Sequence, residues 1–231
     1  MNVHCMESGR AAIDKKDVIE FFDELAPGWD HDLVVDTGKI NTILDAAGVR
    51  ENSRVLDVAC GTGVLFPFYR QRRVADVLAV DISAEMARIA GEKALSPIRV
   101  VCGDMETMPG TGDFDCCVIY NAFPHFPDPA RLVRHLSGWL KPGGRLTVAH
   151  SMSLEQLNRH HSGRAAKVSM GMLPAEELSA IFGHWFTVDI VVSDEEKVYR
   201  FRHTERLILL IPQQKMQALN YECLLFHYDC Y

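Results

Sequence analysis

The sequence lacks the features that mark membrane, secreted and disulfide-stabilised proteins. Its 231 residues include seven cysteines but no C-x-x-C pair, and an odd number of cysteines does not suit a closed disulfide framework. The chain does not open with a basic segment followed by an apolar core, and no apolar run approaches the roughly 18 residues that a spanning helix needs. We therefore expect a reduced, cytoplasmic protein without a membrane span.

Positive charge is also scarce. The 24 lysines and arginines are outnumbered by 31 acidic residues, for a formal net charge of −7, which disfavours nucleic acid as a partner. The sequence has neither a G-x-S-x-G elbow nor a P-loop, so nucleophilic hydrolysis and P-loop chemistry lack support. No histidine or cysteine spacing matches a standard metal site, so no metal is predicted. The length suits one α/β domain with an elaboration.

The most informative segment runs from Val55 to Gly63. A short apolar run there contains the acidic Asp57 and leads into a loop with Gly61 and Gly63. We expect both glycines to be required, because a Cβ atom would block a ligand or forbid the turn. A second apolar run ends in Asp81, at the place where doubly wound sheets bind ribose hydroxyls. The two features together predict a nucleoside cofactor.

The residues around the glycines narrow the choice of cofactor. A dinucleotide fingerprint needs a small third residue where this chain has Phe66, because helix and strand must pack closely there. The acid at Asp57 suits an amine-bearing ligand better than a pyrophosphate. An NAD-type oxidoreductase is therefore the weaker alternative.

Apolar periodicity predicts alternating strands and helices, the pattern of a parallel sheet. We expect two helices before the sheet, near 15–26 and 37–47, and a last helix near 174–182. Asp14, Ser83 and Asp128 are candidate N-caps. The expected core strands are 54–59, 76–81, 98–102, 114–120 and 145–150, with helices near 63–72, 84–94 and 129–140. The expected closing hairpin is 185–193 and 197–204.

Several motifs, in order, resemble those of class I S-adenosylmethionine (SAM)-dependent methyltransferases. They are the segment from Asp57 to Gly63, then Asp81, Gly103-Asp104-Met105, Asn121 and Lys141-Pro142-Gly143-Gly144. The opening segment from Phe21 to Asp30 adds a likeness to ubiquinone and menaquinone biosynthesis methyltransferases. The resemblance implies a Rossmann-like, doubly wound sheet of seven strands, mostly parallel, with an antiparallel strand near the C-terminal end. It also implies SAM as cofactor and a small-molecule acceptor.

The resemblance also assigns roles along the chain. Residues 1–50 would form an N-terminal helical lid, and 51–205 the SAM-binding core with an insertion at 151–173. The tail, 206–231, has no assigned role; covering a sheet edge, self-association as a homodimer, and being atypical of relatives stay open for it. The residues expected to bind SAM are Asp57, Ala59, Gly61, Gly63, Asp81, Ile82, Met86, Asp104, Met105 and Asn121.

Methyl transfer mainly requires that the nucleophile be positioned and its proton removed. His125 and His150 follow the fourth and fifth expected strands, and histidine is a natural base near neutral pH. Either is a candidate catalytic residue and substrate contact. Trp29, Asn158 and His161 are further candidate substrate contacts, the last two sharing a helix face at i and i+3. A non-catalytic SAM-binding or interaction protein is the second alternative.

Overall fold

Five strands of the chain pair in parallel in the order β3-β2-β1-β4-β5, and two more extend the sheet. The computed structural model describes residues 13–31, 33–152, 154–161, 163–193 and 197–202. β7 lies between β5 and β6 and is antiparallel to both. The expected α/β fold with a parallel sheet is confirmed. The strands are β1 (Arg54–Val58), β2 (Asp76–Asp81), β3 (Ile98–Cys102), β4 (Phe114–Tyr120), β5 (Leu140–His150), β6 (Thr187–Ser193) and β7 (Lys197–Arg202).

The helices lie close to their expected positions. Asp14, Ser83 and Asp128 cap their helices as expected, each accepting a backbone N–H in the first turn. The third α-helix begins at Phe66 rather than 63, because residues 61–65 are used by a turn. The α-helices are α1 (Lys15–Leu25), α2 (Thr37–Ala46), α3 (Phe66–Gln71), α4 (Ala84–Lys93), α5 (Pro129–Ser137), α6 (Leu154–His161) and α7 (Ala175–Phe182). The 3₁₀ helices are η1 (Ala26–His31), η2 (Phe123–His125) and η3 (Arg164–Lys167).

Alternate residues of the central strands face two separate cores. Val55 and Val77 point to the layer formed by α2, α3 and α4, whereas Leu56 and Leu78 point to the layer that includes α5 and α7. These strand residues are at most 8% exposed, as expected for a parallel sheet covered on both faces. Among the described residues, no helix is both long and apolar enough to cross a membrane.

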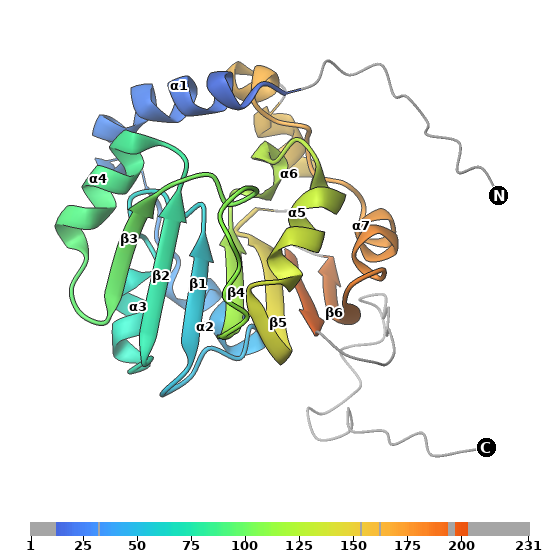
Figure 1. The fold of residues 1–231 in the computed structure, drawn as a ribbon. Helices are drawn as coiled ribbons and strands as arrows, with labels where there is room; N and C mark the ends of the chain where they lie inside the picture. Colours follow the sequence, from blue (N-terminus) through green and yellow to red (C-terminus); the bar gives the residue numbers. More distant parts are fainter. Residues whose placement is uncertain (1–12, 32, 153, 162, 194–196, 203–231) are drawn as a thin grey trace.

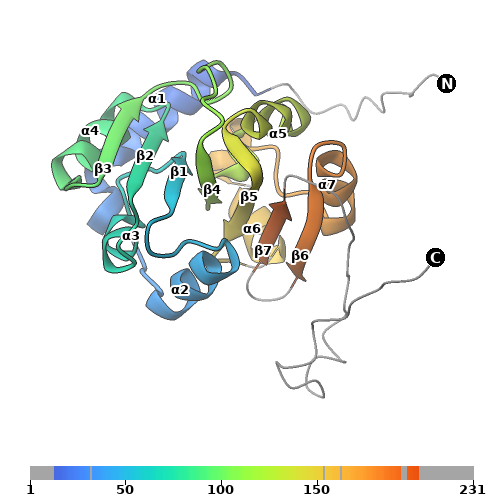
Figure 2. The same cartoon turned by 60° about the horizontal axis from the view of Figure 1, so that its bottom comes forward.

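The strand order reverses between β1 and β4, so the ligand crevice of such a sheet lies outside the carboxyl ends of these strands. α1 crosses the sheet at this end, where the arrows of β1, β2 and β3 point (Figure 1). α2 instead packs against one face of the sheet (Figure 2) through the buried residues Ile40 and Leu44. The two N-terminal helices therefore have different positions relative to the crevice.

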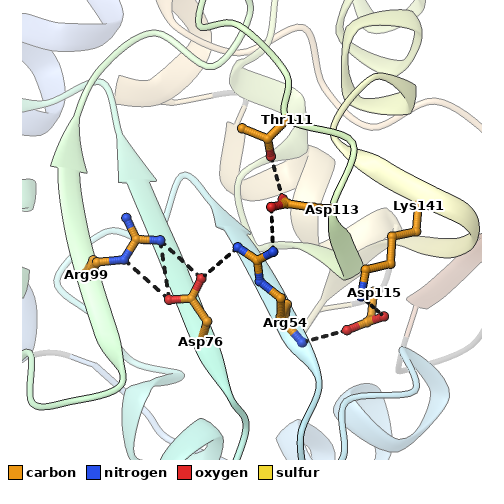
Figure 3. Close-up of polar contacts among 7 residues, drawn as sticks. All are labelled: Arg54, Asp76, Arg99, Thr111, Asp113, Asp115 and Lys141. Atoms are coloured by element: carbon orange, nitrogen blue, oxygen red, sulfur yellow. Dashed lines mark hydrogen bonds and ion pairs between the residues drawn. The ribbon is translucent and has the colours of Figure 1, made fainter.

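The opposite, amino end of the sheet is held by charged side chains (Figure 3). Arg54 on β1 binds Asp76 on β2 at 3.3 Å and Asp113 at 2.5 Å. Arg99 on β3 also binds Asp76 at 3.1 Å. Asp115 accepts the backbone N–H of Arg54 at 2.8 Å. The network joins β1 to three neighbouring segments at the end that faces away from the crevice.

We expect Arg54→Met to lower the free energy of unfolding by roughly 1–2 kcal/mol, because two partly exposed ion pairs and a contact over the Phe114 ring are lost. Urea denaturation should show a lower midpoint with an unchanged slope. The pKa of Asp113 is lowered by Thr111 and by Arg54. The stabilisation that Asp113 contributes to the fold is therefore present above its unfolded pKa of about 4 and is lost as the pH falls further.

Arg88→Met is the matched control, because Arg88 also holds two carboxylates but lies on the solvent side of α4. Its midpoint should barely move. Equal losses for the two variants would show that the network does not hold the amino end together.

Candidate active site

The loop after β1 has a sharply turned backbone. Ala59, Gly61 and Gly63 all have positive φ, at 54°, 55° and 88°. A Cβ atom on Gly61 would meet nothing within 4 Å, so the backbone there faces open space. A Cβ atom on Gly63 would lie 2.6 Å from the Phe66 ring. At Gly63 the positive φ of the turn and the Phe66 ring both require glycine, which agrees with the second of the two expected reasons, that a Cβ atom would forbid the turn.

The carboxylate of Asp81 ties this loop to the next strand. Its Oδ2 accepts the Gly61 N–H at 2.8 Å and its Oδ1 accepts the Ser83 N–H at 2.9 Å. Burial raises the pKa of Asp81, and these N–H groups only partly offset the rise. Ile82 follows it half-buried, and Met86 is buried in the first turn of α4. Each carboxylate oxygen retains acceptor capacity for a further donor.

Asp57 is a second buried carboxylate, 2% exposed, on β1. Burial raises its pKa to about 7; the Tyr69 hydroxyl opposes the rise and the charge of Asp81 adds to it. Neither Asp57 Oδ2 nor the Tyr69 hydroxyl has a hydrogen-bond partner of ordinary geometry among the described residues. A buried carboxylate in this state is suited to meet a hydrogen-bond donor or a cation.

The α1–η1 segment is fastened over this end of the sheet by polar contacts. Asp23 accepts the Ser83 hydroxyl at 2.5 Å, and Asp30 accepts the Thr62 hydroxyl at 2.6 Å. Asp30 also binds Lys93. Burial would raise the pKa of Asp30, but the Lys93 and Thr62 contacts outweigh it and lower the pKa. The segment thus contacts the loop after β1 and the turn after β2.

A third fastening reaches the loop after β3. Lys15 lies 2.7 Å from Asp104 Oδ2 and 2.5 Å from Glu106 Oε2. Burial lowers the pKa of Lys15, but the hydrogen bonds and charges of the two carboxylates outweigh this and raise it. Met105, between the two acids, is buried. Asp104, one of the residues expected to bind SAM, is therefore held by the first residue of α1.

His125 lies in an aromatic row below the same segment. Its ring is 4.9 Å from Phe22, edge to face, and Phe22 is 5.9 Å from Trp29. His125 Nδ1 lies 2.7 Å from the carbonyl oxygen of Val168. A carbonyl can only accept, so Nδ1 carries the hydrogen and the neutral ring has its lone pair on Nε2. The structure therefore brings Trp29 and His125, which the sequence predicted separately, into contact with the same phenylalanine.

Asn121 and His150 lie at the ends of the neighbouring strands β4 and β5. Asn121 has a positive φ of 56°, and its Oδ1 accepts the Ser151 N–H at 2.7 Å. Lys39 of α2 donates to the Ser151 carbonyl at 3.4 Å. His150 is fully buried. Ala59 after β1 and Asn121 after β4 thus both have a positive φ, and strained backbone of this kind is typical of functional sites.

The inserted segment holds itself together through Asn158. Its side chain accepts the Met172 N–H at 2.8 Å and donates to the Met172 carbonyl at 3.4 Å. His161 belongs to the last turn of α6, and its side chain lies outside the described part of the chain. These two residues are therefore not brought together with His125 or His150 by any contact that the structure describes.

Sequence reasoning missed Lys15, Asp23, Asp30 and the carbonyl of Val168 as parts of this region. Lys15 is 89 positions from Asp104 and Val168 is 43 from His125. Nothing local in the sequence marks such pairs. The only available signal was the likeness of the segment from Phe21 to Asp30, which includes the fastening residues Asp23 and Asp30 and the aromatic residues Phe22 and Trp29.

Comparison with known proteins supports the resemblance. Residues 56–148 match the methyltransferase domain family. Demethylmenaquinone methyltransferase of Renibacterium salmoninarum is 32% identical over 148 residues, covering 61% of this chain and 62% of that protein. Ubiquinone/menaquinone biosynthesis C-methyltransferase UbiE of Pectobacterium atrosepticum is 34% identical over 113 residues, covering 46% and 45%. The chain thus spans about half to three fifths of these relatives.

Among solved structures, geranyl diphosphate C-methyltransferase from Streptomyces coelicolor, in complex with S-adenosyl-L-homocysteine, has a TM-score of 0.66. It is 13% identical, and the match covers 82% of this chain and 97% of that one. At this identity the likeness concerns the fold alone. It agrees with the parallel α/β sheet described above.

The two glycines of the loop should respond differently to alanine. We expect Gly63→Ala to lower the free energy of unfolding by roughly 2–4 kcal/mol, since positive φ is strained and the Phe66 ring must move. Gly61→Ala should be destabilised only by the strained backbone, so its free energy of unfolding should fall by about 1–2 kcal/mol. Urea denaturation of the ligand-free proteins measures both.

The double variant Gly63→Ala, Phe66→Leu should recover part of the loss, because the smaller side chain relieves the overlap. Identical midpoints for the two single variants would contradict the packing role of Gly63.

Proposed function

We propose that this chain is a class I SAM-dependent methyltransferase that transfers a methyl group from SAM to a small-molecule acceptor. The match of residues 56–148 to the methyltransferase domain family and the named relatives support this proposal. The observation that carries the proposal is the pair of buried carboxylates at the carboxyl ends of β1 and β2. Asp81 accepts the N–H of Gly61, where the backbone faces open space, and Asp57 Oδ2 has no hydrogen-bond partner among the described residues. SAM offers the hydroxyl and ammonium donors that these acceptors lack.

The residues present fit the cofactor in the following way. Asp81 would accept ribose hydroxyls, and Asp57 would face the ammonium group. The loop from Ala59 to Gly63 would lie against the methionine part. Bound SAM supplies a methyl group on a positively charged sulfur, which is a good leaving group. The other proposed contacts are Ile82, Met86, Asp104, Met105 and Asn121.

The acceptor is proposed to enter beside the aromatic row. Phe22 and Trp29 offer ring faces and edges for a planar ring, which suits the quinone-type acceptors named for the relatives. His125 Nε2 would take the acceptor's proton or orient the acceptor. His150 is fully buried, so its proposed influence runs through its neighbours in β5. Asn158 and His161 are proposed to support the acceptor side through the insertion.

We propose that α1 and η1 are the lid and that α2 belongs to the core layer. The seven-stranded, doubly wound sheet with an antiparallel last strand is part of the same proposal.

The described cysteines, Cys60, Cys102, Cys116 and Cys117, are free, which suits a reducing cytoplasm. The acidic charge favours a small molecule over nucleic acid as acceptor. Light scattering would test the proposed homodimer.

We expect Asp81→Ala to weaken SAM binding at least tenfold. A lost charge-assisted hydrogen bond costs roughly 1.5–3 kcal/mol, and each 1.4 kcal/mol is a factor of ten. Titration calorimetry with SAM measures the affinity. Asp76→Ala, at the other end of the same strand, is the matched control and should bind SAM as the wild type does. Unchanged affinity in a folded Asp81→Ala protein would refute the cofactor assignment.

We expect His125→Gln to lower kcat by at least about a hundredfold while SAM affinity stays unchanged, because general-base catalysis contributes about 10²–10⁴-fold. The assay follows methyl transfer from labelled SAM to demethylated quinols and related phenols.

His135→Gln is the matched control, since His135 Nε2 lies 2.6 Å from the Met108 carbonyl in a comparable contact on α5. His150→Gln tests the second histidine. Near wild-type turnover in both His125→Gln and His150→Gln would mean that positioning alone carries the reaction.

A further inference from the structure

The environment of Asp57 is unusual for a buried carboxylate. Within the described part of the chain, the ionisable groups that act on it are Asp81 from β2, Tyr69 from α3, Cys117 from β4 and Cys60 from the following loop. None of these carries a positive charge. An unpaired buried carboxylate is costly, and such a group commonly keeps its proton instead of ionising.

The position of Asp57 makes this lack of a neighbouring positive charge relevant to ligand binding. It lies on β1 just before the loop whose backbone opens at Gly61. Lys15 and Lys93 both belong to the outer fastenings: they pair with Asp104, Glu106 and Asp30. The described structure thus places cations around the lid and none beside the deepest carboxylate.

We propose that Asp57 exchanges a proton for the ammonium group of the cofactor: it is protonated while the site is empty and ionises when the ligand binds. The neutral acid gives its proton to the solvent, and the resulting carboxylate pairs with the ligand's ammonium. Charge and protons balance without any other reactant. This inference rests on the proposed function, since it requires an amine-bearing ligand in this crevice.

Because Asp57 must release its proton for the ligand to bind, binding should become stronger as the pH rises. With a free-state pKa of about 7, Asp57 is mostly protonated at pH 6 and mostly ionised at pH 8. Apparent affinity scales with the fraction in the binding-competent form. Ligand binding should therefore be roughly tenfold weaker at pH 6 than at pH 8, with release of about half a proton at pH 7. The pKa of Asp81 is also raised, and any contribution of Asp81 to the pH dependence of binding would persist when Asp57 is replaced.

The test is titration calorimetry with S-adenosylhomocysteine, which carries the same ammonium group, from pH 6 to pH 8. Buffers of low and high ionisation enthalpy report the protons released. The wild type should show the tenfold change and the proton release. Asp57→Asn should lose the part of both effects that is due to Asp57 and keep only the contribution of Asp81. Asp30→Asn is the matched control, because Asp30 is paired with Lys93, and it should keep the wild-type pH dependence.

Identical pH profiles for the wild type and Asp57→Asn would overturn the inference while leaving the proposed function intact. Failure of the wild type to bind at any pH would instead overturn the proposed function. Difference infrared spectroscopy of the wild type needs no variant. At pH 6, the carbonyl stretch of a protonated carboxyl should disappear when S-adenosylhomocysteine is added. Its persistence would refute proton exchange.

The ligand-free protein gives a further readout. A folded-state pKa raised above the unfolded value means that Asp57 stabilises the fold at low pH and that this contribution is lost as the pH rises through about 7. Asp57→Asn should therefore raise the melting temperature at pH 8 and change it little at pH 5. An equal shift at both pH values would show that Asp57 does not hold a proton in the empty site.

Discussion

The hydrogen bond from the Gly61 N–H to Asp81 is the interaction on which the rest of the site depends. It joins the turn after β1 to the end of β2 at 2.8 Å, while the other oxygen of the same carboxylate holds Ser83. Ser83 in turn caps α4 and donates to Asp23 of α1. One carboxylate thus fixes the glycine loop, the start of a helix and, through Ser83, the position of α1.

The α1–η1 segment is attached by polar contacts more than by apolar burial. Asp23, Asp30 and Lys15 each contact a different strand-end loop, and among the described residues of α1 only Val18 is buried. Partly exposed ion pairs contribute little net free energy in water. A segment held in this way can separate from the strand ends at low cost in free energy.

The sequence predicted the parts of this arrangement that depend on local patterns. Apolar runs with polar ends located the strands, and Ser83 and Asp128 were recognisable as caps because the signal lies within one turn. Contacts that cross the fold could not be predicted. The meaning of Phe66 is the clearest example: the sequence indicated only that it disfavours a dinucleotide, whereas the structure shows its ring packed against Gly63. The contact of His125 with Val168 uses a backbone carbonyl, which every residue has, so the identity of residue 168 could not predict it.

Charge gives a second reason, independent of Phe66, why the crevice does not suit a dinucleotide. Asp57 and Asp81 are both buried and their charges act on each other, and Asp23 adds its charge to Asp81. A pyrophosphate would bring negative charge towards these carboxylates, and like charges in a poorly solvated site repel strongly. SAM carries a net positive charge, so the same carboxylates attract it. The features that raise the pKa of both acids therefore also select the charge of the ligand.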